Sequence, residues 1–230
     1  MKKRIVVLSL GGSLIIPDNI SVEYLKQFKK AILKNTDKYK FIIVCGGGSI
    51  ARKYISALSE IGMSDLFQSF AGISATRMNA RFMSYFFRQN QERGIPHTMR
   101  ELKRYVRKFD VIFCGALEYK PHQTSDSTAV QIAKKFRTIF INLTDVPGLH
   151  DKNPKKFKDA KFIPKISWKD FNKMANKIKF KPGQHFVLDQ TAARGIMENK
   201  ITTYILGKDM NQMENVLENK KFKGTIIGDF

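Results

Sequence analysis

Short apolar runs alternate along the chain with stretches in which apolar residues recur every three or four positions. The apolar runs predict strands at Arg4–Leu10, 40–45, 110–114, 138–143, 202–206 and 224–227, with a further short strand at 96–99. The periodic stretches predict helices at 21–34, 49–61, 74–92, 99–108, 126–136, 168–177 and 211–218. Residues 186–199 are expected to begin extended and to continue as a helix, and 147–164 to be irregular. This alternation is typical of an α/β protein in which helices connect the strands of a parallel sheet.

Length and composition narrow the class of protein. A chain of 230 residues suits one α/β domain or two small lobes and can bury a core without disulfides. The longest apolar runs are strand-sized, so no transmembrane helix is expected, and the apolar run behind the basic start breaks at Gly11-Gly12, too early for a secretory signal. Two cysteines, Cys45 and Cys114, exclude a disulfide framework and a four-cysteine zinc site. We therefore expect a soluble, cytoplasmic protein.

The net charge of +21 is the least ordinary property of the composition. Eleven lysines and two acids lie between residues 152 and 181. Such a run is usually a solvated surface, but it would also attract a polyphosphate to a nearby site. Nucleic-acid binding ranks below these two interpretations, because no helix-turn-helix, zinc-finger or RNA-binding aromatic motif accompanies the charge. Specific nucleic-acid binding is therefore not expected.

Two predicted strands end in glycine clusters, Gly11-Gly12-Ser13 and Gly46-Gly47-Gly48. Glycine lets backbone N–H groups approach a phosphate, and the carboxyl ends of parallel strands are where ligands bind in open α/β sheets. The pair of clusters therefore predicts one site that holds two phosphate groups, although tight turns alone would use the same residues. Neither the Walker-type phosphate loop nor the Gly-x-Gly-x-x-Gly dinucleotide fingerprint is present.

Motifs in the right order along nearly the whole chain resemble those of the amino acid kinase superfamily, most closely its archaeal-type uridylate (UMP) kinases. They occupy residues 5–13, 46–54, 72–80, 124–129, 144–154, 187–193 and 203–207. The resemblance implies the α/β class and, within it, the amino acid kinase or carbamate kinase-like fold. This fold is a three-layer α/β/α sandwich with a mostly parallel central sheet. It implies a single domain over residues 1–230, with the acceptor bound by the N-terminal part and ATP by the C-terminal part.

The resemblance also implies a reaction and a set of site residues. The reaction is Mg²⁺-dependent transfer of the γ-phosphoryl group from ATP to UMP, which gives UDP for pyrimidine nucleotide biosynthesis. The implied catalytic residues are Asp126, Gly11 and Ser13. The implied ATP-binding residues are Gly11, Gly12, Ser13, Thr144, Asp145, His150, Asn153 and Pro154. The implied acceptor-binding residues are Gly47, Gly48, Arg52, Ser69, Thr76, Asn79 and Thr124, and no protein side chain is assigned as a metal ligand.

Some positions depart from the family pattern. Ser9 stands where many members have a lysine, and Ser69 stands where UMP kinases usually have an aspartate for the ribose; Asp65, one turn earlier, is a candidate substitute. Pro147 and Asn153 replace two aspartates of the nucleotide loop. These departures keep two alternatives open: a kinase for another small phosphate or carboxylate acceptor, and a nucleotide-binding homologue without turnover. The presence of Arg52, Thr76 and Asp126 argues for the kinase.

The predicted helix at 74–92 carries more large apolar residues than one buried face needs, among them Phe82, Met83, Tyr85, Phe86 and Phe87. A second buried face would make the protein a homo-oligomer, and the resemblance implies one built from dimers, up to a hexamer. A helix buried deeply within one subunit is the alternative. The expected partners are therefore ATP, a nucleoside monophosphate and further copies of the chain, with no membrane.

Overall fold

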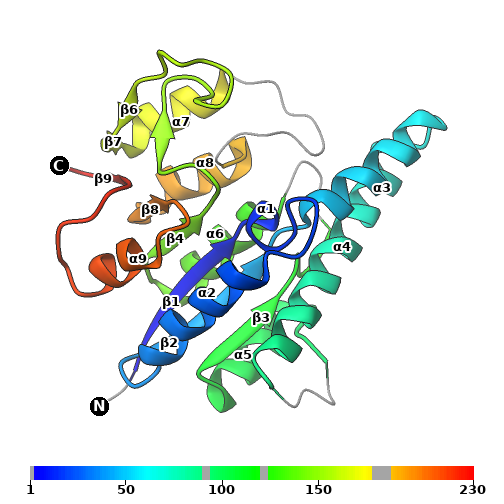
Figure 1. Cartoon of the computed structure of the whole chain (residues 1–230), viewed down its shortest axis with the longest axis horizontal. Coiled ribbons are helices and arrows are strands. Elements are labelled where there is room, and N and C mark those ends of the chain that lie inside the picture. Colours follow the sequence, from blue (N-terminus) through cyan, green and yellow to red (C-terminus); the bar gives the residue numbers. More distant parts are fainter. Residues whose placement is uncertain (1–2, 90–93, 120–123, 178–187) are drawn as a thin grey trace.

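The computed structural model describes residues 3–89, 94–119, 124–177 and 188–230, and a seven-stranded sheet lies at its centre (Figure 1). The sheet has the order β3-β2-β1-β4-β8-β9-β7, and every neighbouring pair is parallel except β8 and β9. Its strands are β1 (Arg4–Leu10), β2 (Tyr39–Cys45), β3 (Val111–Cys114), β4 (Phe140–Leu143), β7 (Lys165–Ser167), β8 (Thr203–Leu206) and β9 (Thr225–Gly228). The mostly parallel sheet predicted from the sequence is confirmed.

Helices cover both faces of this sheet, which confirms the three-layer α/β/α sandwich. One face packs against α1 (Gly12–Ile15), α2 (Val22–Lys34), α9 (Met210–Leu217) and the second half of α4 (Asp65–Phe86). The other packs against α5 (Met99–Lys108), α6 (Ser125–Phe136), α7 (Trp168–Asn176) and α8 (Gln190–Glu198). Because side chains alternate along a strand, Leu8 of β1 joins the first core and its neighbour Val7 joins the second.

The register brings the carboxyl ends of the central strands to one edge of the sheet. Leu10 of β1 pairs with Cys45 of β2 and with Leu143 of β4. The segments that follow these strands, 11–13, 46–48 and 144–154, therefore leave the sheet side by side. Helix α3 (Gly48–Glu60) starts at this edge and runs beside α4 out beyond the body of the molecule (Figure 1).

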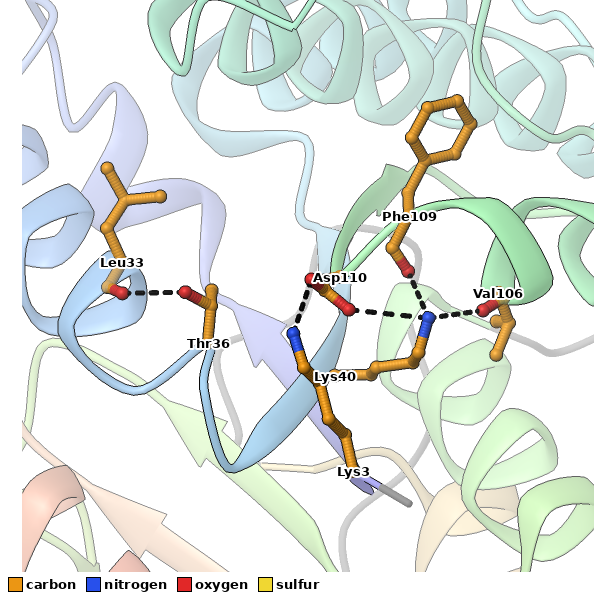
Figure 2. A network of polar contacts seen from close by, with 7 residues as sticks. All are labelled: Lys3, Leu33, Thr36, Lys40, Val106, Phe109 and Asp110. Atoms are coloured by element: carbon orange, nitrogen blue, oxygen red, sulfur yellow. Dashed lines mark hydrogen bonds and ion pairs between the residues drawn. The ribbon is translucent and has the colours of Figure 1, made fainter. Parts of the chain in front are cut away.

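The opposite, amino-terminal edge is held by a charged network (Figure 2). Lys3 Nζ lies 2.6 Å and Lys40 Nζ lies 3.3 Å from the two carboxylate oxygens of Asp110. Lys40 also donates to the carbonyls of Val106 (2.9 Å) and Phe109 (3.1 Å), where α5 ends. Burial alone would raise the pKa of Asp110, but the two ammonium groups lower it below its ordinary value. The network ties the end of α5 to β2 and to Lys3, the residue before β1, at the edge opposite the glycine clusters.

The structure corrects the predicted bounds of one helix. The helix expected at 74–92 is α4, which begins at Asp65 and ends at Phe86; residues 90–92 lie outside the described part. Gly72 and the serines around it hide the periodicity of its first half, which α3 stabilises by packing beside it; a Cβ at Gly72 would lie 3.4 Å from the Ile55 side chain. Most of the large apolar residues that suggested a second buried face pack within this one chain. Met83 and Phe87 are buried in the core and Phe82 and Phe86 pack against it, whereas Tyr85 is 57% exposed.

Other differences concern short elements. Residues 96–99 form no strand, because Thr98 instead caps α5 by accepting a hydrogen bond from the Glu101 N–H at 3.2 Å. The segment 147–164 is not wholly irregular: β5 (Leu149–His150) and β6 (Phe162–Ile163) pair antiparallel, and β7 follows. The four-residue α1 was also unpredicted. Within 186–199, residues 188–189 precede α8 as expected, and 186–187 lie outside the described residues.

No helix among the described residues is long and apolar enough to span a membrane.

Candidate functional site

A cavity of about 750 Å³ opens at the carboxyl edge of the sheet. Its lining comes from both glycine loops, the first turns of α3, the middle of α4, the start of α6 and the segment after β4. The cavity therefore gathers the predicted site residues from five places in the sequence. Those that line it are Gly11, Gly12, Ser13, Gly47, Gly48, Arg52, Ser69, Thr76, Thr124, Asp126, Thr144, Asp145, His150, Asn153 and Pro154. Asn79 is the predicted site residue that does not line it.

The two glycine loops pack against each other backbone to backbone. A Cβ added to Gly12 would lie 1.9 Å from the Gly48 nitrogen, which no real structure tolerates. Gly48 has φ +64°, and a Cβ there would lie 2.6 Å from the Gly12 carbonyl oxygen. Glycine is therefore required at these positions by close approach and by backbone conformation. The result is a floor of bare main chain, as expected for a phosphate site.

Asp126 lies in the first turn of α6 and lines the cavity together with the glycine loops. The Ser9 hydroxyl, at the end of β1, donates a hydrogen bond of 2.7 Å to Asp126 Oδ1. Burial raises the pKa of the Asp126 carboxyl to about 7; the Ser9 hydrogen bond works against this rise and the negative charge of Asp189 adds to it. The carboxyl is thus poised between its two protonation states near neutral pH, which is common at functional sites.

Asp189 is a functional candidate that the site prediction missed. Its side chain is 3% exposed and caps α8 by accepting from the Ala192 N–H at 2.8 Å. The same carboxylate accepts hydrogen bonds from Thr124 Oγ1 at 2.6 Å and from Ser127 Oγ at 2.7 Å. It therefore joins the start of α8 to the start of α6, the turn that carries Asp126. An aspartate before a helix can be read from the sequence as a cap, but its contacts with residues more than 60 positions away cannot.

Hydrogen bonds made by α4 residues hold one side of the cavity in shape. Asn79 is buried behind the second glycine loop and donates from Nδ2 to the Gly46 carbonyl at 2.7 Å. Thr76 Oγ1 donates to the Ile73 carbonyl at 2.7 Å and accepts from the Ala116 N–H at 3.0 Å. Ser69 Oγ donates to the Asp65 carbonyl at 2.7 Å. Asn79 and Thr76 thus tie α4 to the second glycine loop and to the segment after β3, whereas the Ser69 bond lies within α4.

Two further residues on this side were not predicted. Arg77 donates to the carbonyls of Ala116 (3.1 Å) and Leu117 (2.6 Å), which fixes the segment after β3 onto α4. Tyr119, in that segment, lines the cavity with its ring 5.2 Å from the ring of Phe70. Arg52 projects from the second turn of α3 into the cavity lining. The lining contributed by α3, α4 and the segment after β3 thus includes apolar side chains and the Arg52 guanidinium.

The segment after β4 forms the other side of the cavity. Asp145 forms an ion pair with Lys155, and this ammonium lowers the pKa of the Asp145 carboxyl although burial alone would raise it. Asn153 Oδ1 accepts from the Lys155 N–H at 2.9 Å, and His150 Nδ1 lies 3.2 Å from the Gly148 carbonyl oxygen. Four lysines of the basic segment, Lys152, Lys155, Lys156 and Lys177, line the cavity. The segment therefore contributes positive charge to the site; its residues 178–181 lie outside the described part.

The side chains at the site determine how a metal ion could be bound there. Among the described residues, no three histidine, cysteine or acidic side chains gather in a way that could hold a metal ion. Mg²⁺ does not need such a group, because it is commonly held by one or two carboxylates together with substrate phosphates and water. The half-buried Asp126, next to the glycine floor, is a carboxylate that fits this requirement.

Comparisons with known proteins agree with this geometry. The sequence profile of the amino acid kinase family matches residues 4–207. A uridylate kinase from Thermoplasma volcanium is 33% identical over 217 residues, which cover 94% of this chain and 93% of that protein. A uridylate kinase from Archaeoglobus fulgidus is 30% identical over 224 residues, 97% of each chain.

Solved structures share the fold. The crystal structure of the uridylate kinase from Archaeoglobus fulgidus superposes with a TM-score of 0.81 at 28% identity, over 97% of this chain and 99% of that one. The UMP kinase of Bacillus anthracis superposes with a TM-score of 0.80, over 98% of this chain and 96% of that one. At 18% identity the second likeness concerns the fold alone.

Proposed function

The chain belongs to the amino acid kinase family, and from this premise we propose that it transfers the γ-phosphoryl group of ATP to UMP, giving ADP and UDP. The observation that carries the proposal is the cavity at the carboxyl edge, which two closely packed glycine loops line together with Arg52 and Asp126. Phosphoryl transfer needs positioning and charge neutralisation more than covalent chemistry, and this cavity offers both.

The acceptor lies against α3 and α4 in this proposal. Gly47 and Gly48 present main chain to the UMP phosphate, and Arg52 binds that phosphate through its guanidinium fork. Thr76, Thr124 and Ser69 line the remainder of the acceptor pocket, and Asn79 holds the glycine loop from behind through the Gly46 carbonyl. The phosphate is itself an anionic nucleophile, so no strong base is required.

ATP lies along the segment after β4 in this proposal. Thr144, Asp145, His150, Asn153 and Pro154 line its nucleotide end, and Gly11, Gly12 and Ser13 receive the transferring phosphoryl group. Asp126 organises the donors around this group from the start of α6. Mg²⁺, held by the ATP phosphates with Asp126 nearby, supplies neutralisation of phosphate charge when bound. The cytoplasm, where ATP and UMP are both available, is the proposed place of action.

The test is a coupled ADP-release assay against the four common nucleoside monophosphates, with Arg52→Ala and, as a matched control, Arg104→Ala on α5. We expect UMP to be the preferred acceptor. Arg52→Ala should raise the KM for UMP at least about 10-fold, because a charge-assisted bond to phosphate is worth about 1.5–3 kcal/mol, and should leave the KM for ATP within about twofold. If another nucleoside monophosphate is preferred, the chain is a kinase for a different acceptor. If no acceptor leads to ADP release, the chain is a nucleotide-binding homologue without turnover.

We also propose a homo-oligomer built from dimers, up to a hexamer, with one domain per chain. Support comes from the α3–α4 pair, which extends beyond the sheet (Figure 1) and carries exposed apolar side chains. They include Tyr54, Ile61, Met63, Leu66, Phe67 and Phe70. Light scattering at micromolar concentration should give a multiple of 26.4 kDa, and Phe67→Glu should lower that mass whereas Tyr85→Glu should change it less. A wild-type mass of one chain would exclude the oligomer.

A further inference from the structure

The ion pairs of the molecule leave one of its basic surfaces without neutralising acids. Those formed by the described residues lie at the amino-terminal edge of the sheet, on α2 and around α9, and within segment 145–173. In this part of the chain no ion pair includes a residue of α5 or α6, two helices that pack on the same face of the sheet. Both helices nevertheless carry exposed bases. The positive charge of this face is therefore open to a ligand.

Helix α5 presents its bases to solvent. Leu102 and Val106 are buried in the core, so the apolar side of the helix faces the sheet. Its acid, Glu101, accepts a hydrogen bond from the His97 N–H at 2.7 Å, next to the start of the helix. The exposed residues of the helix include Arg100, Lys103, Arg104, Arg107 and Lys108. From Arg100 to Arg107 this row of positive charge extends about 10 Å along the helix axis.

Helix stability and composition do not account for this row. Arg107 and Lys108 lie in the last turn, where cations complement the helix dipole, but Arg100 lies in the first turn, where a cation is unfavourable. Arg104 lies four residues from both Arg100 and Lys108, a spacing at which like charges repel each other. A lysine-rich composition does not explain the arginines of α5 either, since residues 138–230 contain a single arginine, Arg194. A bound polyanion would turn this repulsion into attraction.

A cavity of about 1120 Å³ continues the basic surface. Met99, the first residue of α5, lines it, and its lining along α6 extends from Thr128 to the C-cap Arg137, about 13 Å. Its apolar lining comes from Met99, Leu117, Ile139 and Ile201. Its basic lining is exposed and comes from Lys134, Lys135, Arg137 and Lys200, against one acid, Glu118. We call the exposed bases of α5 together with this cavity the α5–α6 surface.

The lining of the surface indicates which polyanion it fits. An anionic membrane would need an apolar face on α5 that can enter the lipid, and the apolar side of α5 is buried in the core. A nucleic-acid duplex would offer phosphates to the bases of α5 but nothing to the apolar lining of the cavity, because its own bases are stacked inside. A single strand offers both phosphates and bases free to stack on apolar side chains or guanidinium planes.

We infer that the α5–α6 surface binds single-stranded nucleic acid independently of its sequence. The bases of α5 engage the phosphates, and the cavity along α6 receives unstacked bases. This binding goes beyond the kinase activity and does not depend on it.

The test is fluorescence anisotropy with a labelled RNA of 12 nucleotides and mixed sequence. The RNA has a 5′-hydroxyl, and Mg·ADP and UMP are present at saturation, so that the kinase cavity is occupied. One variant is Arg100→Gln/Arg104→Gln/Arg107→Gln, and a second, independent one is Lys134→Gln/Lys135→Gln. The control, Lys26→Gln/Lys30→Gln/Lys38→Gln, removes three exposed charges from the α2 side of the fold and so has the net charge of the first variant. Thermal melts establish that all three fold.

Wild type should bind the RNA with a Kd of about 1–10 μM at about 50 mM salt, weakening steeply as salt rises. The α5 variant should bind at least about 10-fold more weakly and lower the log–log salt slope by about 2, because each phosphate contact on a single strand contributes about 0.7 to that slope. The α6 variant should bind at least about 5-fold more weakly, and the α2 control should stay within about twofold of wild type. DNA of the same sequence separates two sources of the strand: equal affinity identifies phosphates and bases as the ligand, and tighter RNA binding adds the 2′-hydroxyl groups.

An equal loss in the α2 control would overturn the inference, because net charge rather than this surface would then attract the RNA. Unchanged binding in the two folded surface variants would also overturn it. So would a duplex that binds as tightly as the single strand, or binding to phosphatidylserine vesicles without binding to the RNA. ADP release with UMP should stay at the wild-type level in all three variants, and loss of the kinase function would leave the binding measurements unchanged.

Discussion

Ser9 and Asp189 should move the pH dependence of the reaction in opposite directions. Ionised Asp126 accepts the hydrogen bond of Ser9, at 2.7 Å, and organises the phosphate-binding groups, so kcat should rise with pH to a plateau above about 7. Removing the hydroxyl in Ser9→Ala takes away a bond that stabilises the ionised carboxylate. Removing the negative charge in Asp189→Asn takes away a repulsion that destabilises it. The midpoint should therefore move up in the first variant and down in the second.

The size of each effect follows from the contacts. A hydrogen bond to a charged group is worth about 1.5 kcal/mol, and 1.36 kcal/mol corresponds to one pH unit, so Ser9→Ala should raise the midpoint by about one pH unit. The effect of Asp189→Asn should be smaller, about half a pH unit, because the repulsion from Asp189 contributes less to the pKa of Asp126 than burial and the Ser9 hydrogen bond do. Asparagine can still accept from the Ala192 N–H and from Ser127, so the caps of α6 and α8 should persist.

The measurement is kcat between about pH 5.5 and 9 at saturating substrates and constant ionic strength. Ser59→Ala and Asp37→Asn, both at exposed positions, serve as the matched controls, and thermal melts verify folding. Shifts of the same sign in the two variants would refute the reasoning. So would unshifted profiles in two folded variants, since Asp126 would then not be the titrating group.

The remaining predictions concern the glycine floor, the buried charge and the basic rim. Gly12→Ala should lower kcat at least about 100-fold and lower the Tm, because the new Cβ would lie 1.9 Å from the Gly48 nitrogen; calorimetry and kinetics verify this, and an active, stable variant would contradict the packing. Asp126→Asn should abolish most turnover but raise the free energy of unfolding at pH 8. Because folding raises the pKa of Asp126, its carboxyl group favours the native state below about pH 4, and this contribution is lost as pH rises through about 7. The asparagine variant does not lose it. Its gain in the free energy of unfolding, discounted for partial exposure, should therefore be about 1–2 kcal/mol at pH 8 and near zero at pH 4 in urea titrations. Raising salt from about 50 to 200 mM should increase the KM for ATP severalfold if the lysines of segment 152–177 attract it, and an unchanged KM would assign them to solvated surface.

Local patterns determined the order of elements and the place of the site. Strand-sized apolar runs, each followed by an amphipathic stretch, predicted a parallel sheet, and the pairing of Leu10 with Cys45 and Leu143 confirms it. Two glycine clusters after two strands predicted a phosphate site at one edge, because parallel strands all end on that side. The same local logic failed where packing overrides periodicity. The first half of α4 is helical because α3 lies beside it, and β5 and β6 are too short to leave a pattern.

The tertiary structure alone decided which groups touch. Ser9 and Asp126 are 117 residues apart in sequence, and Asp189 reaches Thr124 across 65. Capping preferences mark Thr124 and Asp189 as helix starts, but they do not say that the two caps share a hydrogen bond. The protonation of Asp126 depends on how much water the surrounding layers exclude and on the charge of Asp189, and both arise only once β1, α6 and α8 are packed. For the same reason a sequence shows how many lysines a chain has, whereas the structure decides that Lys152, Lys155, Lys156 and Lys177 line the cavity.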